Sequence, residues 1–363
     1  MDEEWNISMA GCGFSSVYYL GALACILERA PRLVHGASRI CGASSGCLVA
    51  AALTVGLPVE HLCVDVLRAA KEARRHHLSV FHPNFSLLRT VRDSLQEKLP
   101  QDAHLRASGR LCVSLTRMSN WKNVLVSQFD SREELIQVLM CSCFFPIYCG
   151  FVPPLYRGEL FMDGALSNNM PLFEQRNTIT LAPFCSESDI CPKDGAFTCV
   201  SVHYANLSIQ VTTGNVHRIC TSFLPPAFEE LADIFQGGYA DALRFLIRGD
   251  LLGPSSWQDK GDSLKSAEGL QEDIPLSSKK AMCAGWREAG LVGAGPSWQL
   301  RIWFCLLTPL VLGAELIFFL IKSLLMTTNN LIGLRRSRPR RQAELQPLEE
   351  APTRPLRRQE GGD

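Results

Sequence analysis

The first 250 residues alternate between short apolar runs and longer stretches in which apolar positions recur every three or four residues. An apolar run at Trp5–Ala10 predicts a strand, and the apolar positions of Val17–Arg29 have the spacing of a helix. The same order returns at Ala37–Cys41, a candidate strand, and Cys47–Val55, a candidate helix. Strands that alternate with helices predict an α/β domain, with a sheet sandwiched by helices.

The rest of this region continues the alternation. Ser131 and Glu134 form a capping-box pattern, which is typical of a helix start. Further helices are predicted at Val59–Arg75, Ser86–Leu99, Ser131–Ser142 and Gly237–Arg248, and further strands at Leu111–Thr116, Asn123–Phe129, Leu160–Asp163, Asn177–Ala182 and Thr198–His203. The apolar, proline-broken run Cys143–Pro154 is interpreted either as core or as the lining of an acyl-binding trough.

The pattern changes after Leu252. Residues 253–299 are rich in Ser, Gly, Pro and charged residues and show no sustained periodicity, so they predict a flexible polar linker. Residues 335–363 begin with a basic cluster suited to anionic lipid headgroups and continue as a mixed-charge, disordered tail.

Between these two segments lies an apolar stretch at residues 300–334. Its core, Ile302–Ile321, is long enough to span a bilayer as a helix. Pro309 and Glu315 lie inside it, and a central carboxylate is costly in hydrocarbon. A spanning helix, an interfacial anchor and a buried core helix are all open, and the proline and glutamate favour an anchor in one leaflet or in a lipid-droplet monolayer.

Composition bears on the partners and the cellular compartment of the protein. A net charge of zero and an apolar fraction of 47% give no indication of a nucleic-acid partner. The start of the chain, Met1–Trp5, is acidic and lacks an apolar signal region, so we expect the 15 cysteines to be reduced and the protein to lie on the cytoplasmic side. Cys141 and Cys143 lack a second pair at zinc-finger spacing, and no metal site is predicted.

The candidate chemistry centres on Gly42–Gly46, which reads G-x-S-x-G with Ser44 in the middle. Strand, sharp turn and helix is the setting of a nucleophile elbow, in which the serine hydroxyl is exposed at a helix N-terminus. The alternative is a turn of small residues before a buried helix. Ser45 provides a second hydroxyl next to the first, and only the register of the motif favours Ser44.

A glycine loop, Gly11–Cys12–Gly13, follows the first predicted strand. Its backbone amides could bind a nucleotide phosphate or form an oxyanion hole, and the loop could also be only a tight turn. The phosphate-loop pattern G-x-x-x-x-G-K-[ST] is absent, and no lysine is nearby. Because the serine elbow comes one strand–helix unit later, the oxyanion hole is the favoured interpretation.

The third candidate is Asp163, at the end of an apolar strand and directly before Gly164. Most Asp-Gly pairs are merely turns. This aspartate lies at the end of a strand, where open α/β sheets place their functional residues.

Taken together, Gly11–Phe14, Gly42–Gly46 and Asp163–Gly164 resemble the patatin-like phospholipase domain family. Further strings are similar to its subgroup of adipose triglyceride lipase and adiponutrin: Trp5–Ser8, Ser114–Arg117, Glu134–Gln137, Cys141–Pro146, Pro153–Pro154, Asp189–Pro192 and Gly238–Leu246. The resemblance covers roughly Trp5 to Leu252, so we expect an acylhydrolase domain at residues 5–252.

The resemblance implies a fold and an activity. The fold would be a patatin-like three-layer sandwich with a central mixed sheet flanked by helices, followed by the C-terminal apolar anchor. Ser44 would be the nucleophile of a Ser–Asp dyad with Asp163, and Gly11, Cys12 and Gly13 would form the oxyanion hole. The activity would be hydrolysis of acyl esters of triacylglycerol and related lipids, and in some members acyl transfer between acylglycerols. The family needs no cofactor, acts at a lipid droplet or membrane surface, and can take a protein coactivator.

Two positions depart from the family pattern: Ser16 stands where a third loop glycine is usual, and Ser45 where alanine is usual. They leave open a rival interpretation, a weakly active or non-catalytic lipid-droplet protein that competes for lipase partners. A Ser–His–Asp triad would have to use His203 or His217, which follow Asp163. Because Ser44 follows only one earlier strand, we expect no histidine to take part.

Overall fold

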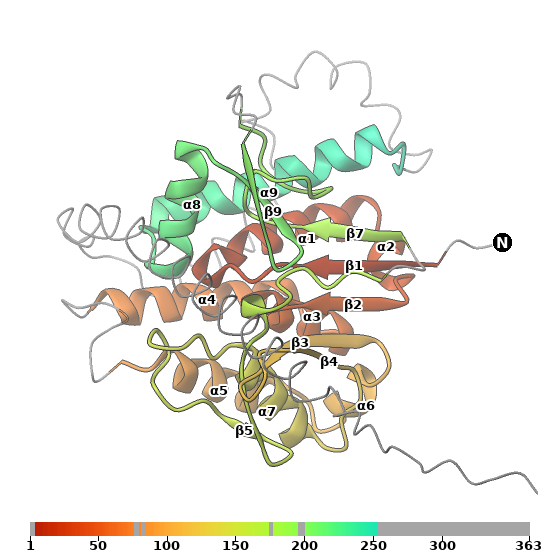
Figure 1. Ribbon diagram of the computed structural model, residues 1–363. Coiled ribbons are helices and arrows are strands. Elements are labelled where there is room, and N and C mark those ends of the chain that lie inside the picture. Colours follow the sequence, from red (N-terminus) through yellow and green to blue (C-terminus); the bar gives the residue numbers. More distant parts are fainter. Residues whose placement is uncertain (1–3, 76–79, 81–84, 174–176, 195–199, 253–363) are drawn as a thin grey trace, which may run out of the picture. The chain divides into compact units, whose positions relative to one another are not determined.

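One mixed sheet runs through the part of the chain that the structure describes, residues 4–75, 80, 85–173, 177–194 and 200–252 of a computed structural model. Its strand order is β5-β6-β3-β2-β1-β7, with β4 paired to β3. Figure 1 shows β7 (Asn177–Leu181), β1 (Trp5–Met9), β2 (Arg39–Gly42) and β3 (Leu111–Arg117) side by side. These four strands are parallel, as expected for strands joined by crossover helices.

The other three strands are antiparallel to their neighbours. β4 (Asn123–Val126) and β6 (Glu159–Asp163) both pair with β3, and β5 (Leu155–Tyr156) pairs with β6. β4 covers one edge of β3 over residues 113–116, while β2 pairs with residues 111–113 and β6 with residues 115–117. A strand has two edges, so β2 and β6 share the remaining edge of β3. They run toward each other, and their C-terminal ends meet.

Helices pack against this sheet. Their bounds are α1 (Val17–Arg29), α2 (Arg32–His35), α3 (Ser45–Val55), α4 (Val59–Arg74), α5 (Leu87–Lys98), α6 (Ala103–Ala107), α7 (Arg132–Ser142), α8 (Thr213–Phe223) and α9 (Phe228–Arg248). Short 3-10 turns lie at Gly13–Ser16 and Gly164–Leu166, and a separate hairpin is formed by β8 (Ser201–Tyr204) and β9 (Leu207–Gln210). The result is an α/β fold with a mixed central sheet flanked by helices (Figure 1).

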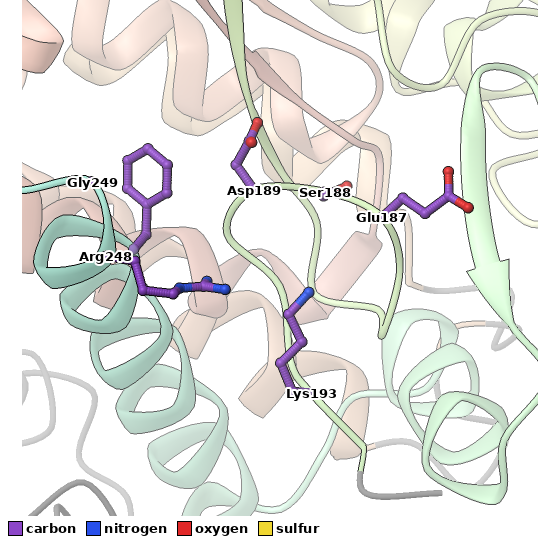
Figure 2. A pocket seen from close by; sticks show the side chains of 7 residues that line it. Glu187, Ser188, Asp189, Lys193, Arg248 and Gly249 are labelled. Carbon is purple, nitrogen blue, oxygen red and sulfur yellow. The ribbon is translucent and has the colours of Figure 1, made fainter. Parts of the chain in front are cut away.

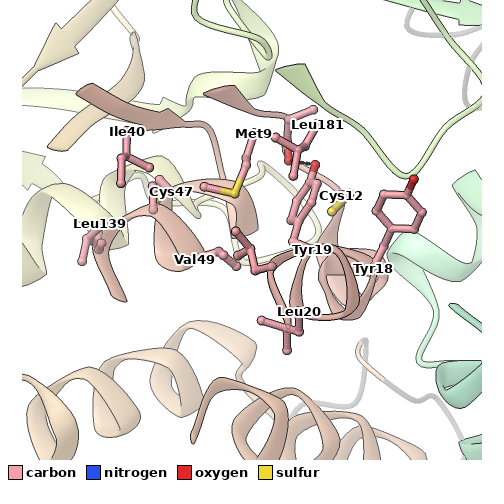
Figure 3. Close-up of a cluster of buried hydrophobic side chains, with 14 of the residues drawn as sticks. Met9, Cys12, Tyr18, Tyr19, Leu20, Ile40, Cys47, Val49, Leu139 and Leu181 are labelled. Atoms are coloured by element: carbon pink, nitrogen blue, oxygen red, sulfur yellow. Dashed lines mark hydrogen bonds between the residues drawn. The ribbon is translucent and has the colours of Figure 1, made fainter. Parts of the chain in front are cut away.

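The core lies between the strands and α1 and α3. Met9 and Ile40 from neighbouring strands face Tyr19 of α1 and Val49 of α3, and these side chains are almost wholly buried (Figure 3). The buried Tyr19 hydroxyl donates a hydrogen bond of 2.6 Å to the Ala10 carbonyl oxygen, which satisfies the one polar atom of that ring.

Two glycines let α1 and α9 approach each other closely. A Cβ atom on Gly21 would lie 1.9 Å from the Phe235 carbonyl oxygen, and one on Gly238 would lie 2.0 Å from the Tyr18 carbonyl oxygen. Beside this crossing, the Tyr18 hydroxyl donates to Asp241 Oδ2 at 2.7 Å. Backbone contact and a buried hydrogen bond therefore fix the last described helix onto the first.

Most predicted elements are present, with small shifts at their ends. α1 has the predicted bounds, and the Ser131 hydroxyl caps α7 by accepting a 3.1 Å hydrogen bond from the Glu134 amide. The main error concerns α9, which begins at Phe228 rather than at Gly237. Gly237 and Gly238 thus lie inside α9, although glycine weakens a helix interior. In the folded protein Gly238 is needed there for the contact with α1.

Other parts of the prediction are not tested by this fold. The predicted linker, anchor and tail, residues 253–363, lie outside the described residues. Among the residues that are described, none of the helices combines the length and the apolar character needed to cross a membrane.

The α1–α9 contact gives a paired test of stability. Gly238→Ala should lower the free energy of unfolding by about 1–3 kcal/mol or more, because the new methyl group would overlap backbone atoms of α1. Gly237→Ala is the control: a Cβ there meets nothing within 4 Å, so it should stabilise α9 by about 0.5–1 kcal/mol. Urea denaturation followed by circular dichroism measures both. Equal effects at the two positions would contradict the close approach of the helices.

Candidate active site

The turn between β2 and α3 holds Ser44 in a strained backbone conformation. Ser44 has φ 51° and ψ −132°, a region that residues with side chains rarely adopt. A Cβ on Gly42 would lie 2.5 Å from the Gly46 carbonyl carbon, and one on Gly46 would lie 2.5 Å from the Met9 carbonyl oxygen. Only glycine fits at either position, so the G-x-S-x-G pattern has the geometry of a nucleophile elbow.

Ser142, at the end of α7, supports this turn from below. Its buried hydroxyl accepts a 3.0 Å hydrogen bond from the Ser44 amide and donates one of 2.8 Å to the Ser114 carbonyl oxygen. It thus ties the strained residue to strand β3. The sequence analysis missed Ser142, because a serine at the end of a predicted helix carries no signal of a contact 98 residues away in the chain.

Asp163 lies beside Ser44 at the end of β6. The Ser44 hydroxyl lies close enough to the carboxyl group to lower its pKa, and the Ala165 amide donates to Asp163 Oδ1 at 2.8 Å. The side chain is only 1% exposed. Burial raises the pKa of Asp163 from 3.8 to about 7, although the hydrogen bonds from Ser44 and Ala165 act in the opposite direction.

The backbone around Asp163 is held on both sides. Its amide donates to the Phe144 carbonyl oxygen at 2.8 Å, and its own carbonyl oxygen accepts a 2.7 Å bond from the Thr116 hydroxyl. A Cβ on Gly164 would lie 2.1 Å from the Ser114 carbonyl oxygen. The glycine of the Asp-Gly pair is therefore required by close packing on β3, which sets the position of the carboxyl group.

The glycine loop adjoins Ser44. A Cβ on Gly11 would lie 2.7 Å from Ser44 Cβ. The Gly11 amide donates to Asn169 Oδ1 at 2.7 Å, and the Cys12 amide donates to Ser45 Oγ at 3.1 Å. Gly13 has φ 52° and packs on the Ser222 carbonyl, where a Cβ would lie 2.0 Å from the oxygen. Two of the predicted oxyanion donors therefore bond to side chains in this structure.

The two neighbouring hydroxyls, which the sequence could not separate, point in different directions. Ser44 faces Asp163, whereas Ser45 Oγ faces the glycine loop, with Cys12 Sγ 3.5 Å away. Burial raises the pKa of the Cys12 thiol to about 12, so the thiol stays neutral and is a poor nucleophile.

Both histidines that a triad would need pair with glutamates. His203 Nε2 lies 4.0 Å from Glu187, and His217 Nε2 lies 2.9 Å from Glu230. Their side chains are exposed, whereas Asp163 is buried. Neither histidine is therefore among the groups that contact the buried Asp163 carboxyl.

A separate cavity of about 410 Å³ lies between the 187–193 loop and the end of α9 (Figure 2). Its lining carries both signs of charge, from Glu187, Asp189, Lys193 and Arg248, and includes neither Ser44 nor Asp163. Nor do the described residues contain a group of three or more His, Cys, Asp or Glu side chains placed to hold a metal ion.

Comparison with known proteins gives this geometry a family context. Residues 7–174 match the family model of patatin-like phospholipases, a range that holds the glycine loop, the elbow and Asp163. Patatin-like phospholipase domain-containing protein 2 from Rattus norvegicus is 45% identical over 251 residues, which cover 69% of this chain and 52% of that protein.

Two human proteins are similar as well. Patatin-like phospholipase domain-containing protein 5 is 42% identical over 250 residues, covering 68% of this chain and 58% of that protein. The 1-acylglycerol-3-phosphate O-acyltransferase PNPLA3 is 40% identical over 301 residues, covering 83% of this chain and 60% of that protein. The alignments thus span between about half and three fifths of each relative. From the matched domain and these relatives, the chain belongs to the patatin-like phospholipase family, in the subgroup of adipose triglyceride lipase and adiponutrin.

Proposed function

We propose that this protein is a serine acylhydrolase that cleaves acyl esters of triacylglycerol and related lipids, with Ser44 as nucleophile and Asp163 as its base. The observation that carries the proposal is the contact between a serine in a strained elbow and a buried carboxyl group whose pKa is about 7. An ordinary aspartate, with a pKa near 4, is a poor base toward a hydroxyl. A base with a pKa near the working pH is far more effective.

The reaction would proceed in two halves. Ser44 Oγ attacks the ester carbonyl carbon while its proton passes to Asp163, and the tetrahedral intermediate collapses to an acyl-serine as Asp163 returns that proton to the departing alcohol. Water then attacks the acyl-serine, gives a proton to Asp163, and releases the fatty acid with Ser44 restored. An acceptor alcohol in place of water would give acyl transfer by the same steps, in keeping with the relative named as an acyltransferase.

The amides of Gly11, Cys12 and Gly13 would stabilise the negative charge that develops on the carbonyl oxygen. For this to happen the oxyanion must displace the Asn169 and Ser45 oxygens that now accept from Gly11 and Cys12. These side chains accept hydrogen bonds from the loop amides when no substrate is bound. They therefore compete with the substrate oxygen for the same amides.

The setting of the activity is also part of the proposal. The substrate class implies work at a lipid droplet or membrane surface on the cytoplasmic side. Residues 300–334 would serve as an anchor to that surface, and a protein coactivator is a further partner. The rival is a non-catalytic lipid-droplet protein with the same fold, and the reactivity of Ser44 separates the two.

Ser44→Ala and Asp163→Asn should each reduce hydrolysis of p-nitrophenyl butyrate to background, and the double variant should be no slower than either single variant, because the two groups act as a unit. A fluorophosphonate probe should label the wild type and not Ser44→Ala. A probe that labels Ser45 instead, or an unlabelled wild type, would overturn the assignment.

Replacing His203 and His217 with glutamine should leave turnover within roughly tenfold of the wild type, well short of the loss typical of a triad member.

The rate should depend on pH with a midpoint near 7. Asp163 must be ionised to accept the serine proton, so kcat/KM should fall as pH drops through the folded-state pKa of about 7. A pH–rate profile on the soluble ester measures this. A midpoint near 4 would mean that the carboxyl group has an ordinary pKa and that burial does not tune it.

Ser45→Ala should increase kcat/KM by roughly fivefold, the equivalent of one hydrogen bond of about 1 kcal/mol, because the Cys12 amide would no longer be occupied. Ser142→Ala is the matched control: it removes a hydroxyl that supports Ser44, and it should lower the rate. If Ser45→Ala lowered the rate as much as Ser142→Ala, Ser45 would be holding the glycine loop in place rather than competing for it.

A further inference from the structure

Three large apolar side chains project into solvent from one short loop between α7 and β5. Ile147 is 70% exposed, Phe151 86% and Val152 81%. Single exposed apolar residues are common, but neighbouring ones gathered on one loop mark an interaction site. This loop, residues 147–152 (the apolar loop), belongs to the run that the sequence suggested as core or acyl-chain lining. Its tip is neither buried in the core nor enclosed.

The apolar loop has a fixed conformation. The Ile147 amide donates to the Gly150 carbonyl oxygen, and the Cys149 amide to the Phe145 carbonyl oxygen, both at 2.8 Å. Ile147 adopts φ 70°, a genuine outlier for a β-branched residue. Strain of this kind persists only where the surrounding structure holds it, and it is concentrated at functional positions.

The inner side of the loop is fastened to α8. The Tyr148 hydroxyl donates to the Phe223 carbonyl oxygen at 2.6 Å, and the Tyr148 and Phe223 rings meet edge to face at 5.5 Å. Phe145 also packs edge to face on the Phe223 ring, with the ring centroids 5.6 Å apart. Tyr148 points inward and its neighbour Ile147 points outward. The exposure of the apolar side chains therefore follows from the way the loop packs on α8.

The residues just before the apolar loop contact the backbone of Asp163. The Phe144 carbonyl oxygen accepts the Asp163 amide hydrogen bond, and the charge of Asp163 adds to burial in raising the pKa of Cys149 to about 12. Cys149 lies two residues from Phe151, a chain distance of about 7 Å. The exposed side chains therefore belong to the segment that adjoins Asp163, on its solvent-facing side.

We propose that the apolar loop inserts into the lipid surface and holds the Ser44–Asp163 site against it. This inference rests on the proposed function, because a water-insoluble ester must leave its surface to reach Ser44. Residues 143–154 carry no charged side chain that insertion would have to dehydrate. A protein partner is a poorer fit, since a stable interface buries about 1,200–2,000 Å², far more than three side chains supply.

The position of the loop can be tested with a tryptophan probe in the full-length protein. After the emission of the wild type with its six native tryptophans is subtracted, the added tryptophan of Phe151→Trp should shift to shorter wavelength when triolein droplets coated with phosphatidylcholine are added, and brominated phosphatidylcholine should quench it. Leu105→Trp, corrected in the same way, is the matched control, because Leu105 is also largely exposed, at 70%, but lies on α6. No shift at position 151, or an equal shift at both positions, would overturn the proposal, and so would a shift that appears only on raising protein concentration without lipid.

The functional consequence is measured with the double variant Phe151→Ser/Val152→Ser. Turnover of the coated triolein droplets should fall at least tenfold, while hydrolysis of soluble p-nitrophenyl butyrate stays within twofold of wild type and Leu105→Ser changes neither. Equal losses on both substrates would place the loop inside the site and contradict docking. If the wild type hydrolyses neither substrate, the proposed function fails, whereas the tryptophan shift still tests the loop.

Discussion

Strand β3 pairs along one edge with two strands that run in opposite directions, and the candidate site exists because those strands end beside each other. β2 delivers the turn that contains Ser44, and β6 delivers Asp163. The registers are linked through β3, since Gly42 pairs with Val113 and Asp163 pairs with Leu115. A slip of one residue in either pairing would turn the side chains to the opposite face of the sheet and separate the two groups.

This arrangement brings together two residues whose conformation or burial costs free energy. Ser44 has a strained backbone, and Asp163 is a carboxyl group without water around it. Because its folded-state pKa is raised to about 7, Asp163 stabilises the fold least above pH 7. Its own contribution to the free energy of unfolding falls as pH rises from about 4 to about 7, by an amount on the order of 4 kcal/mol. The contacts of Ser142, Thr116 and Gly164 with β3 and β6 hold the site together against this cost.

The two departures from the family pattern, Ser16 and Ser45, have different roles in the structure. Ser16 is buried at the entry to α1, so a side chain is tolerated where a third glycine is usual. Ser45 instead reaches the Cys12 amide and changes what the glycine loop bonds to when no substrate is present. The apolar loop completes the arrangement on the outer side: its Tyr148 bonds to α8, and Phe144, shortly before the loop, accepts the hydrogen bond of the Asp163 amide.

The sequence by itself determined the local elements and the three motifs. Strand and helix periodicity located α1 at its observed bounds, and glycines with no room for a Cβ explain why Gly42, Gly46 and Gly164 mark the site. The elements and the motif strings themselves consist of residues close together in the chain, and such residues leave a pattern that can be read along it.

Only the tertiary structure decided which groups meet. The direction of β6 could not be read from residues 159–163, because an apolar strand has the same pattern whether it pairs parallel or antiparallel. The support from Ser142 and Asn169, the different orientations of Ser44 and Ser45, and the outward turn of Ile147 all depend on contacts between distant segments. Short polar side chains and single apolar residues carry no periodic signal of such contacts, so packing alone sets their roles.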